Sequence, residues 1–177
     1  MINQIILLIV TVIVFSSPRP ANATSPKPAN NIIESPIPGE WNTHQGGTGK
    51  NIVCYISSAP TKKTGKYKRR GDTYLFVTHR PAEKEFDVFE LRAGYKYKKD
   101  STVIIDIDGQ KFKLFTVNNT AWAKDSKTDG SLARAMIRGR KMTITGTSSR
   151  GTKTFDTYPL KGFTAAYNLS RKICGIG

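Results

Sequence analysis

Short runs of β-forming residues, separated by turn residues, fill most of the middle of the chain. Residues 51–57 and 73–80 are rich in branched and aromatic side chains, and Pro81 ends the second run. Residues 85–90 alternate acidic and apolar side chains, which is the pattern of a strand with one buried face. We therefore predict three strands in this part of the chain.

The clearest local pattern is a hairpin over residues 101–115. The Asp-Gly pair at 108–109 accepts the positive φ angles of a type I′ turn, and β-forming runs flank it on both sides. In the second run Phe112 and Leu114 share one face, and the lysines beside them share the other with Phe115. This alternation predicts a strand that buries only one of its faces.

A second hairpin is predicted close to the end of the chain. Residues 142–145 and 152–158 are β-forming, and the Gly- and Ser-rich residues 146–151 connect them. Arg150 and Asp156 could pair across this hairpin and fix its register.

Two helices are predicted around that hairpin. In the first, residues 129–131 would cap a helix that carries Leu132, Ala135 and Met136 and stops at Gly139. In the second, buried-type residues recur at helical spacing from Phe163 to Cys174. Strands at short spacing, with helices only near the end, predict an all-β domain. We expect a mostly antiparallel, sandwich or barrel-like fold with short helices near the C-terminus.

The first 23 residues have the composition of a secretory signal peptide. An apolar run from Ile5 to Phe15 is followed by Ala21-Asn22-Ala23, an A-x-A cleavage site. The run is shorter than the roughly 20 residues of a spanning helix, which argues against an uncleaved anchor. We expect cleavage after Ala23, no transmembrane segment afterwards, and a protein exported to the periplasm, the cell surface or the medium.

The segment that follows the predicted cleavage site is rich in proline. Residues 24–40 contain four prolines, which favour an extended leader. We predict that the folded domain spans residues 41–177 and begins near Trp41.

The chain has two cysteines, Cys54 and Cys174, and an exported chain meets an oxidising compartment. Two cysteines permit a single internal bridge, which we predict. Closing so long a loop would contribute roughly 4–5 kcal/mol on the loop-entropy account. The two histidines are distant in sequence and add too little to these cysteines for a metal site.

The chain is strongly basic, with a formal net charge of +15. One run combines six cations with an aromatic ring and contains no acid: Lys62, Lys63, Lys66, Tyr67, Lys68, Arg69 and Arg70. We interpret it as a loop that could contact a polyanion, with counterion release from the cations and a stacking face from the tyrosine. The alternative is a merely solvated loop. Further cations lie at residues 96–99 and 138–141, and there is no nucleic-acid fold signature, so nucleic acid is not expected as a partner.

Arg70-Gly71-Asp72 is also the tripeptide that integrins bind, and adhesion through it is a further hypothesis. The structural alternative is that Asp72 caps a turn and pairs with a neighbouring cation.

The sequence offers little for catalysis. The serines at 148–149 do not lie in the G-x-S-x-G elbow that exposes a nucleophile, and neither His44 nor His79 belongs to a recognisable catalytic motif. Asp106 and Asp108 share a face and could hold a cation, although the turn already explains Asp108. We identify no catalytic, cofactor-binding or metal-binding residue and expect no enzyme.

Several ordered pieces of the chain resemble the invasion-associated locus B family of exported bacterial proteins, from about Trp41 to Cys174. The matching pieces include residues 146–152, 156–166, 69–74, 79–81, 94–95, 107–109, 112–115, 121–125 and 135–136, together with Cys54-Tyr55 and the terminal Cys174. The resemblance implies an exported β domain linked, in some pathogens, to entry into host cells, including red cells. It assigns no catalytic residue.

Together these observations predict an exported, envelope- or virulence-associated binding protein whose basic surface attaches to an anionic host-cell or envelope surface. One alternative is a structural periplasmic protein with no host-binding role. Another is an unrecognised hydrolase that uses His44 or His79 as its base.

Overall fold

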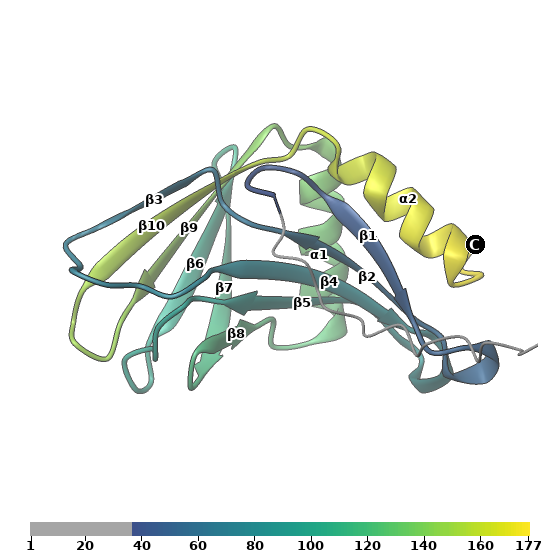
Figure 1. The fold of residues 1–177 in the computed structure, drawn as a ribbon, viewed down its shortest axis with the longest axis horizontal. Helices are drawn as coiled ribbons and strands as arrows, with labels where there is room; N and C mark the ends of the chain where they lie inside the picture. The colour runs from purple at the N-terminus through teal and green to yellow at the C-terminus, as the bar shows by residue number, and fades with distance from the viewer. Residues whose placement is uncertain (1–36) are drawn as a thin grey trace, which may run out of the picture. The chain divides into compact units, whose positions relative to one another are not determined.

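The computed structural model describes residues 37–177 (Figure 1). The predicted signal peptide and most of the proline-rich leader therefore lie outside the described residues. Neither helix in the described part is both long and apolar enough to cross a membrane.

Within residues 37–177, ten strands form one antiparallel sheet whose order is β1-β2-β4-β5-β8-β7-β6-β9-β10-β3. The strands are β1 Asn42–Gly46, β2 Val53–Ser58, β3 Lys62–Gly65, β4 Tyr74–Arg80, β5 Glu85–Arg92, β6 Thr102–Ile107, β7 Gln110–Val117, β8 Thr120–Trp122, β9 Lys141–Thr147 and β10 Lys153–Pro159. The helices are α1 Ser126–Arg138 and α2 Phe163–Ile173, with 3-10 turns η1 Gly49–Asn51 and η2 Pro81–Glu83. The mostly antiparallel β fold with short helices is confirmed.

The sheet curls into a half-barrel, and at one corner the residues just before β1 and β3 contact the end of β10. The chain leaves β2 through residues 59–61 and enters β3, which pairs with β10. At this corner the Thr61 N–H donates to the Thr157 carbonyl at 2.9 Å. The Trp41 indole N–H donates to the Pro159 carbonyl, also at 2.9 Å. The architecture is therefore the barrel-like one of the two that the sequence predicts.

The inner face of the curled sheet carries the hydrophobic core. Alternate residues of the strands point inward, including Leu75, Phe89, Ile105 and Leu114, and all are fully or almost fully buried. Helix α1 packs against β5 and β7, and α2 against β1 and β2. Both helices therefore complete a core that the open half-barrel could not enclose alone (Figure 1).

The hairpin predicted over residues 101–115 is present as β6 and β7. Asp108 and Gly109 have φ angles of 48° and 98°, as a type I′ turn requires. Phe112 and Leu114 are buried, and Phe115 on the other face is 48% exposed. The second predicted hairpin is present as β9 and β10, paired from Lys141 with Pro159 to Thr147 with Lys153.

Two local predictions are wrong. Helix α1 is capped by Asp125, whose carboxylate accepts the Thr128 N–H at 2.8 Å, and not by residues 129–131. Asp129 lies inside the first turn, and its buried carboxylate accepts the Phe89 N–H at 2.9 Å. The sequence Ala121-Trp122-Ala123 also predicts a buried indole, but Trp122 is only half-buried, and it is Ala121 that faces the core.

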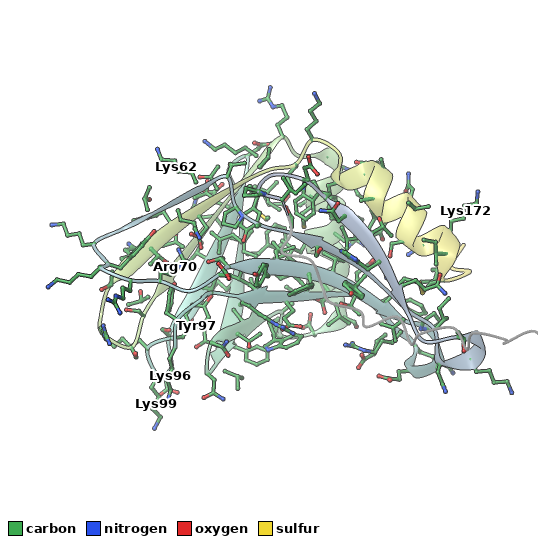
Figure 2. The ribbon with its side chains drawn as sticks, in the orientation of Figure 1. Lys62, Arg70, Lys96, Tyr97, Lys99 and Lys172 are labelled. Atoms are coloured by element: carbon green, nitrogen blue, oxygen red, sulfur yellow. A yellow bond between two sulfur atoms is a disulfide. The ribbon has the colours of Figure 1, made fainter. Side chains whose placement is uncertain are left out.

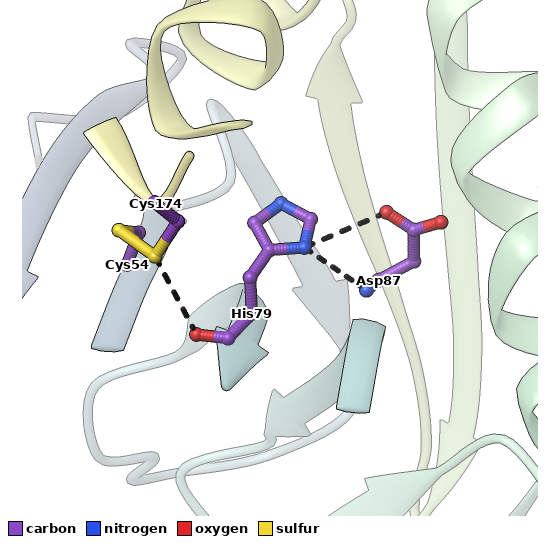
Figure 3. Close-up of a disulfide and its surroundings, with 4 residues drawn as sticks. All are labelled: Cys54, His79, Asp87 and Cys174. Carbon is purple, nitrogen blue, oxygen red and sulfur yellow. Dashed lines mark hydrogen bonds and ion pairs between the residues drawn. A yellow bond between two sulfur atoms is a disulfide. The ribbon is translucent and has the colours of Figure 1, made fainter. Parts of the chain in front are cut away.

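The predicted disulfide is confirmed. Cys54 on β2 and Cys174 just after α2 are bonded, with Cα atoms 5.9 Å apart and a sequence separation of 120. The bridge fastens the end of α2 to the sheet (Figure 3). As predicted, Phe163, Ala166, Tyr167 and Ser170 form the buried face of α2.

Candidate functional site

The basic run is predicted to be a single loop, but in the structure it is divided between a strand and a loop. Lys62 and Lys63 belong to β3, a strand at the edge of the sheet, and the loop begins only after Gly65. Lys62 lies opposite Thr157 and Lys63 opposite Asp156, so the two lysines project on opposite faces. Both are exposed. Lysines on an edge strand discourage pairing with another chain, which gives these two a structural role.

The rest of the run lines a hollow at one end of the sheet. The segment 66–70, residues 95–96 and the turn after β9 enclose a cavity of about 530 Å³. The described residues that line it include no acid and are Lys66, Tyr67, Lys68, Arg69, Arg70, Tyr95, Lys96, Ser148, Ser149, Arg150, Thr152 and Thr154. Three segments that are far apart in sequence thus bring their cations together.

Backbone hydrogen bonds hold two of these segments together. The Lys98 N–H donates to the Thr147 carbonyl at 3.0 Å, and the Ser149 N–H donates to the Lys96 carbonyl at 2.7 Å. Gly146 is required for this close approach, because a Cβ there would lie 2.7 Å from the Tyr95 hydroxyl. The presence of glycine at position 146 is thus explained by packing against Tyr95.

Arg70 forms the floor of the cavity and is not part of its exposed charge. Its guanidinium makes two hydrogen bonds of 2.6 Å to the Asp156 carboxylate and one of 2.8 Å to the Ala93 carbonyl. The side chains of Arg70 and Asp156 are each only 3% exposed. Burial opposes the positive charge, but the hydrogen bonds and charge of Asp156 outweigh it and raise the pKa of Arg70.

This pair corrects two interpretations of the sequence. Arg70-Gly71-Asp72 does not offer its guanidinium to a partner, because that group is buried against Asp156. The predicted pairing of Arg150 with Asp156 is also wrong, since Asp156 is paired with Arg70 and Arg150 is exposed in the cavity lining.

The central cavity continues into a hollow on either side. One of about 600 Å³ shares Lys66 and Arg150 with it and extends to Lys153 and Phe155. The other, of about 560 Å³, shares Lys96 and Ser149 and extends along residues 97–100. We call the three together the basic groove, whose exposed cations are Lys66, Lys68, Arg69, Lys96, Lys98, Lys99, Arg150 and Lys153.

The groove is distinct from the other basic stretches of the chain. Among residues 37–177, Asp100 is the one acid that lines its three hollows, and Lys62 and Lys63 line none of them. Lys96 and Lys99 lie at one end of the sheet, and Lys172 lies on α2 at the other (Figure 2). The cations at 138–141 lie beside Asp108, whose carboxylate accepts the Arg140 N–H at 2.7 Å. Tyr95 and Lys153 also line the groove, although no local pattern in the sequence marks them as site residues.

The two histidines that a hydrolase would use as bases both lie on strands, His44 on β1 and His79 on β4. His79 is fully buried, and its Nδ1 accepts the Asp87 N–H at 3.1 Å (Figure 3). Burial, only partly offset by the charge of Asp87, lowers the pKa of His79. His44 stacks on Tyr55 and lies 2.8 Å from the Ser57 hydroxyl, which belongs to a fully buried residue.

The acidic side chains on the β6–β7 hairpin serve the turn. Asp106 accepts the Gly109 N–H at 2.8 Å and pairs with Lys111, and these hydrogen bonds lower the pKa of Asp106. Among residues 37–177, no group of three or more His, Cys, Asp or Glu side chains is arranged to hold a metal ion.

Comparison with known protein families gives a match over most of the described residues. A family profile described as "Invasion associated locus B (IalB) protein" matches residues 41–171. No curated protein and no solved structure matches the chain.

Proposed function

The chain belongs to the Invasion associated locus B family, and on this premise we propose that it is an exported protein that binds anionic surfaces through the basic groove. The observation that carries the proposal is the groove itself: in the described part of the chain, its three connected hollows are lined by eight exposed cations and one acidic residue. Charges of one sign that line a concave surface reinforce one another and attract polyanions.

The attachment is electrostatic and involves no chemical step. The exposed lysines and arginines of the groove release counterions from a densely charged partner, so binding weakens steeply as salt rises. Arg70 contributes no free charge, because Asp156 neutralises it. The net charge of +15 adds a long-range attraction to host-cell or envelope surfaces.

Export is supported by the disulfide and by the predicted signal peptide. A buried bridge between Cys54 and Cys174 suits the periplasm, the cell surface or the medium, where thiols are oxidised. The family description connects such a protein with invasion.

Two alternatives carry different expectations. In a structural envelope protein the cations would only keep the surface soluble. Substituting a lysine in the groove would then affect binding no more than substituting a lysine elsewhere on the surface. A hydrolase would need His79 or His44 as its base. Full burial of His79, and of the serine that His44 contacts, favours the binding role.

The test compares two variants of the full chain that lose the same charge. Four groove lysines are changed to Gln in the first variant: Lys66, Lys68, Lys96 and Lys98. Four exposed lysines outside the groove are changed in the control: Lys62, Lys63, Lys161 and Lys172. Binding of each purified protein to host cells such as erythrocytes is measured between about 50 mM and about 200 mM salt.

We expect saturable wild-type binding that falls with salt, a large loss in the groove variant and little change in the control. Equal losses in both variants would show that only net charge matters and would favour the structural alternative. Absence of binding at the lowest salt would refute the proposal.

A further inference from the structure

We infer that the basic groove holds a linear acidic polysaccharide along its length, an inference that rests on the proposed function and specifies its ligand. A uniform cation-rich surface would attract any polyanion, whereas this groove combines charge, hydroxyls and restricted ring faces in one connected path.

The path is continuous because neighbouring hollows share lining residues. Lys66 and Arg150 line both the central cavity and the hollow that reaches Phe155. Lys96 and Ser149 line both the central cavity and the hollow that reaches Lys99. A ligand that meets all of these cations must be extended, and a single small anion would fill only one hollow.

The central cavity offers more than charge. Its wall includes the hydroxyl-bearing residues Ser149 and Thr152, which suit the hydroxyl groups of a sugar. Cations on either side can pair with sulfate or carboxylate groups on successive sugars. A repeating acidic sugar polymer supplies both kinds of group at regular spacing.

The two tyrosine rings of the cavity are already engaged. The Arg70 guanidinium carbon lies 4.9 Å from the Tyr95 ring centre and 5.8 Å from that of Tyr67. Tyr95 also packs edge-on against Tyr97 at 5.2 Å and shares a 2.6 Å hydrogen bond with Thr154. Single-stranded nucleic acid needs open ring faces for its bases to stack on, so the cavity favours sugars.

The groove also differs from a membrane-binding surface. Attachment to a bilayer places cations around apolar side chains that enter the lipid. Here the cations line hollows, and Phe155, which is 41% exposed, stands at one end of the groove. A flat bilayer could not enter the central cavity between residues 66–70 and the turn at 148–150.

The test uses heparin oligosaccharides of increasing length as probes of the full chain, with binding measured by calorimetry over a salt series. Inorganic sulfate and phosphatidylglycerol vesicles serve as the other anion sources. The groove variant is Lys66→Gln with Lys68→Gln. The matched control is Lys62→Gln with Lys63→Gln, which removes the same charge from the same run outside the groove.

We expect affinity to rise with oligosaccharide length until the groove is filled, and then to level off. The slope of log K against log salt should fall by about one for each groove lysine removed, about two in the groove variant, and stay unchanged in the control.

Equal affinity for sulfate and for long oligosaccharides would overturn the inference in favour of a single-anion site. Binding to vesicles without binding to heparin would also overturn it, while the proposed attachment to anionic surfaces would stand. An equal change of slope in the control variant would overturn the assignment to the groove. Binding to none of the probes at low salt would refute the proposed function as well.

Discussion

Changing Asp156 to Asn should cost more stability than most single substitutions in this domain. The change keeps the volume of the side chain but removes its charge, which leaves the Arg70 guanidinium buried without a counter-ion. Breaking a buried ion pair by neutralising one partner costs about 3–5 kcal/mol. Domains of this kind are stable by only about 5–15 kcal/mol, so the loss is a large fraction of the total.

Urea unfolding followed by tryptophan fluorescence would measure this loss. Trp41 is a suitable reporter because it packs edge-on against Phe163 at 4.9 Å. Glu85→Gln is the matched control, since Glu85 pairs with Arg80 on the surface, where its side chain is 48% exposed. That surface pair should contribute at most about 1 kcal/mol.

A double variant separates lost pairing from lost packing. Arg70→Met with Asp156→Val replaces the ion pair by apolar side chains, which is often neutral or stabilising in a buried site. The double variant also removes the hydrogen bond from Arg70 to the Ala93 carbonyl, but that carbonyl still accepts a hydrogen bond from the Thr73 hydroxyl at 3.3 Å. We expect the double variant to recover most of the stability. A loss below about 1 kcal/mol in Asp156→Asn, or no recovery in the double variant, would refute the reasoning.

Three further predictions concern stability. Replacing Cys54 and Cys174 by Ala should lower the free energy of unfolding by about 4–5 kcal/mol through the long loop that the bridge closes; an equal urea midpoint with and without the bridge would contradict this. Burial raises the pKa of Asp129 to about 6 from 3.8, so the wild type loses stability as pH rises through 6. The advantage of Asp129→Asn over the wild type should therefore grow by about 3 kcal/mol between pH 4 and pH 7, and urea titrations showing a constant difference would argue against it. Gly94→Ala should cost about 2–4 kcal/mol, because φ is +71° and the new Cβ would lie 2.3 Å from the Gly71 carbonyl oxygen. Gly109→Ala, at φ +98° with open space around it, should cost only about 1 kcal/mol, and urea unfolding of the two glycine variants would measure the difference.

Local patterns were enough to predict several elements of the fold. The Asp-Gly turn at 108–109 and the alternation of Phe112 and Leu114 depend on residues within one hairpin. The helical spacing from Phe163 to Cys174 likewise lies within one segment. The disulfide could be predicted from the number of cysteines, because two cysteines allow only one internal bridge.

The errors arose where a distant partner decides the local structure. Residues 62–65 have no apolar pattern, and they form a strand because β10, about 90 residues later, offers its edge. Asp156 had a plausible partner nearby in Arg150, but the fold brings Arg70, which is 86 residues away, to the same place. In the helix, both Asp125 and Asp129 had cap-like contexts, and only the contact with the Phe89 N–H decided between them.

The candidate site was predictable in part. The sequence marked residues 66–70 as basic, but it could not show that the turn at 148–150 and the residues at 95–99 would lie against them. The sequence also could not show that Lys62 and Lys63 lie outside the groove that begins at Lys66, because this depends on β3 ending at Gly65.

The order in which the chain is synthesised has a consequence for this groove. One wall of the groove comes from residues 66–70, but the facing wall, with Arg150 and Lys153, is made much later. The pairing of β3 with β10 and the bridge between Cys54 and Cys174 also require residues that are made about 90 to 120 positions later. Because contacts of such long range form slowly, the binding surface is assembled only after residues 148–174 have been made. A nascent or truncated chain therefore has the cations of the first wall without a groove to hold a ligand.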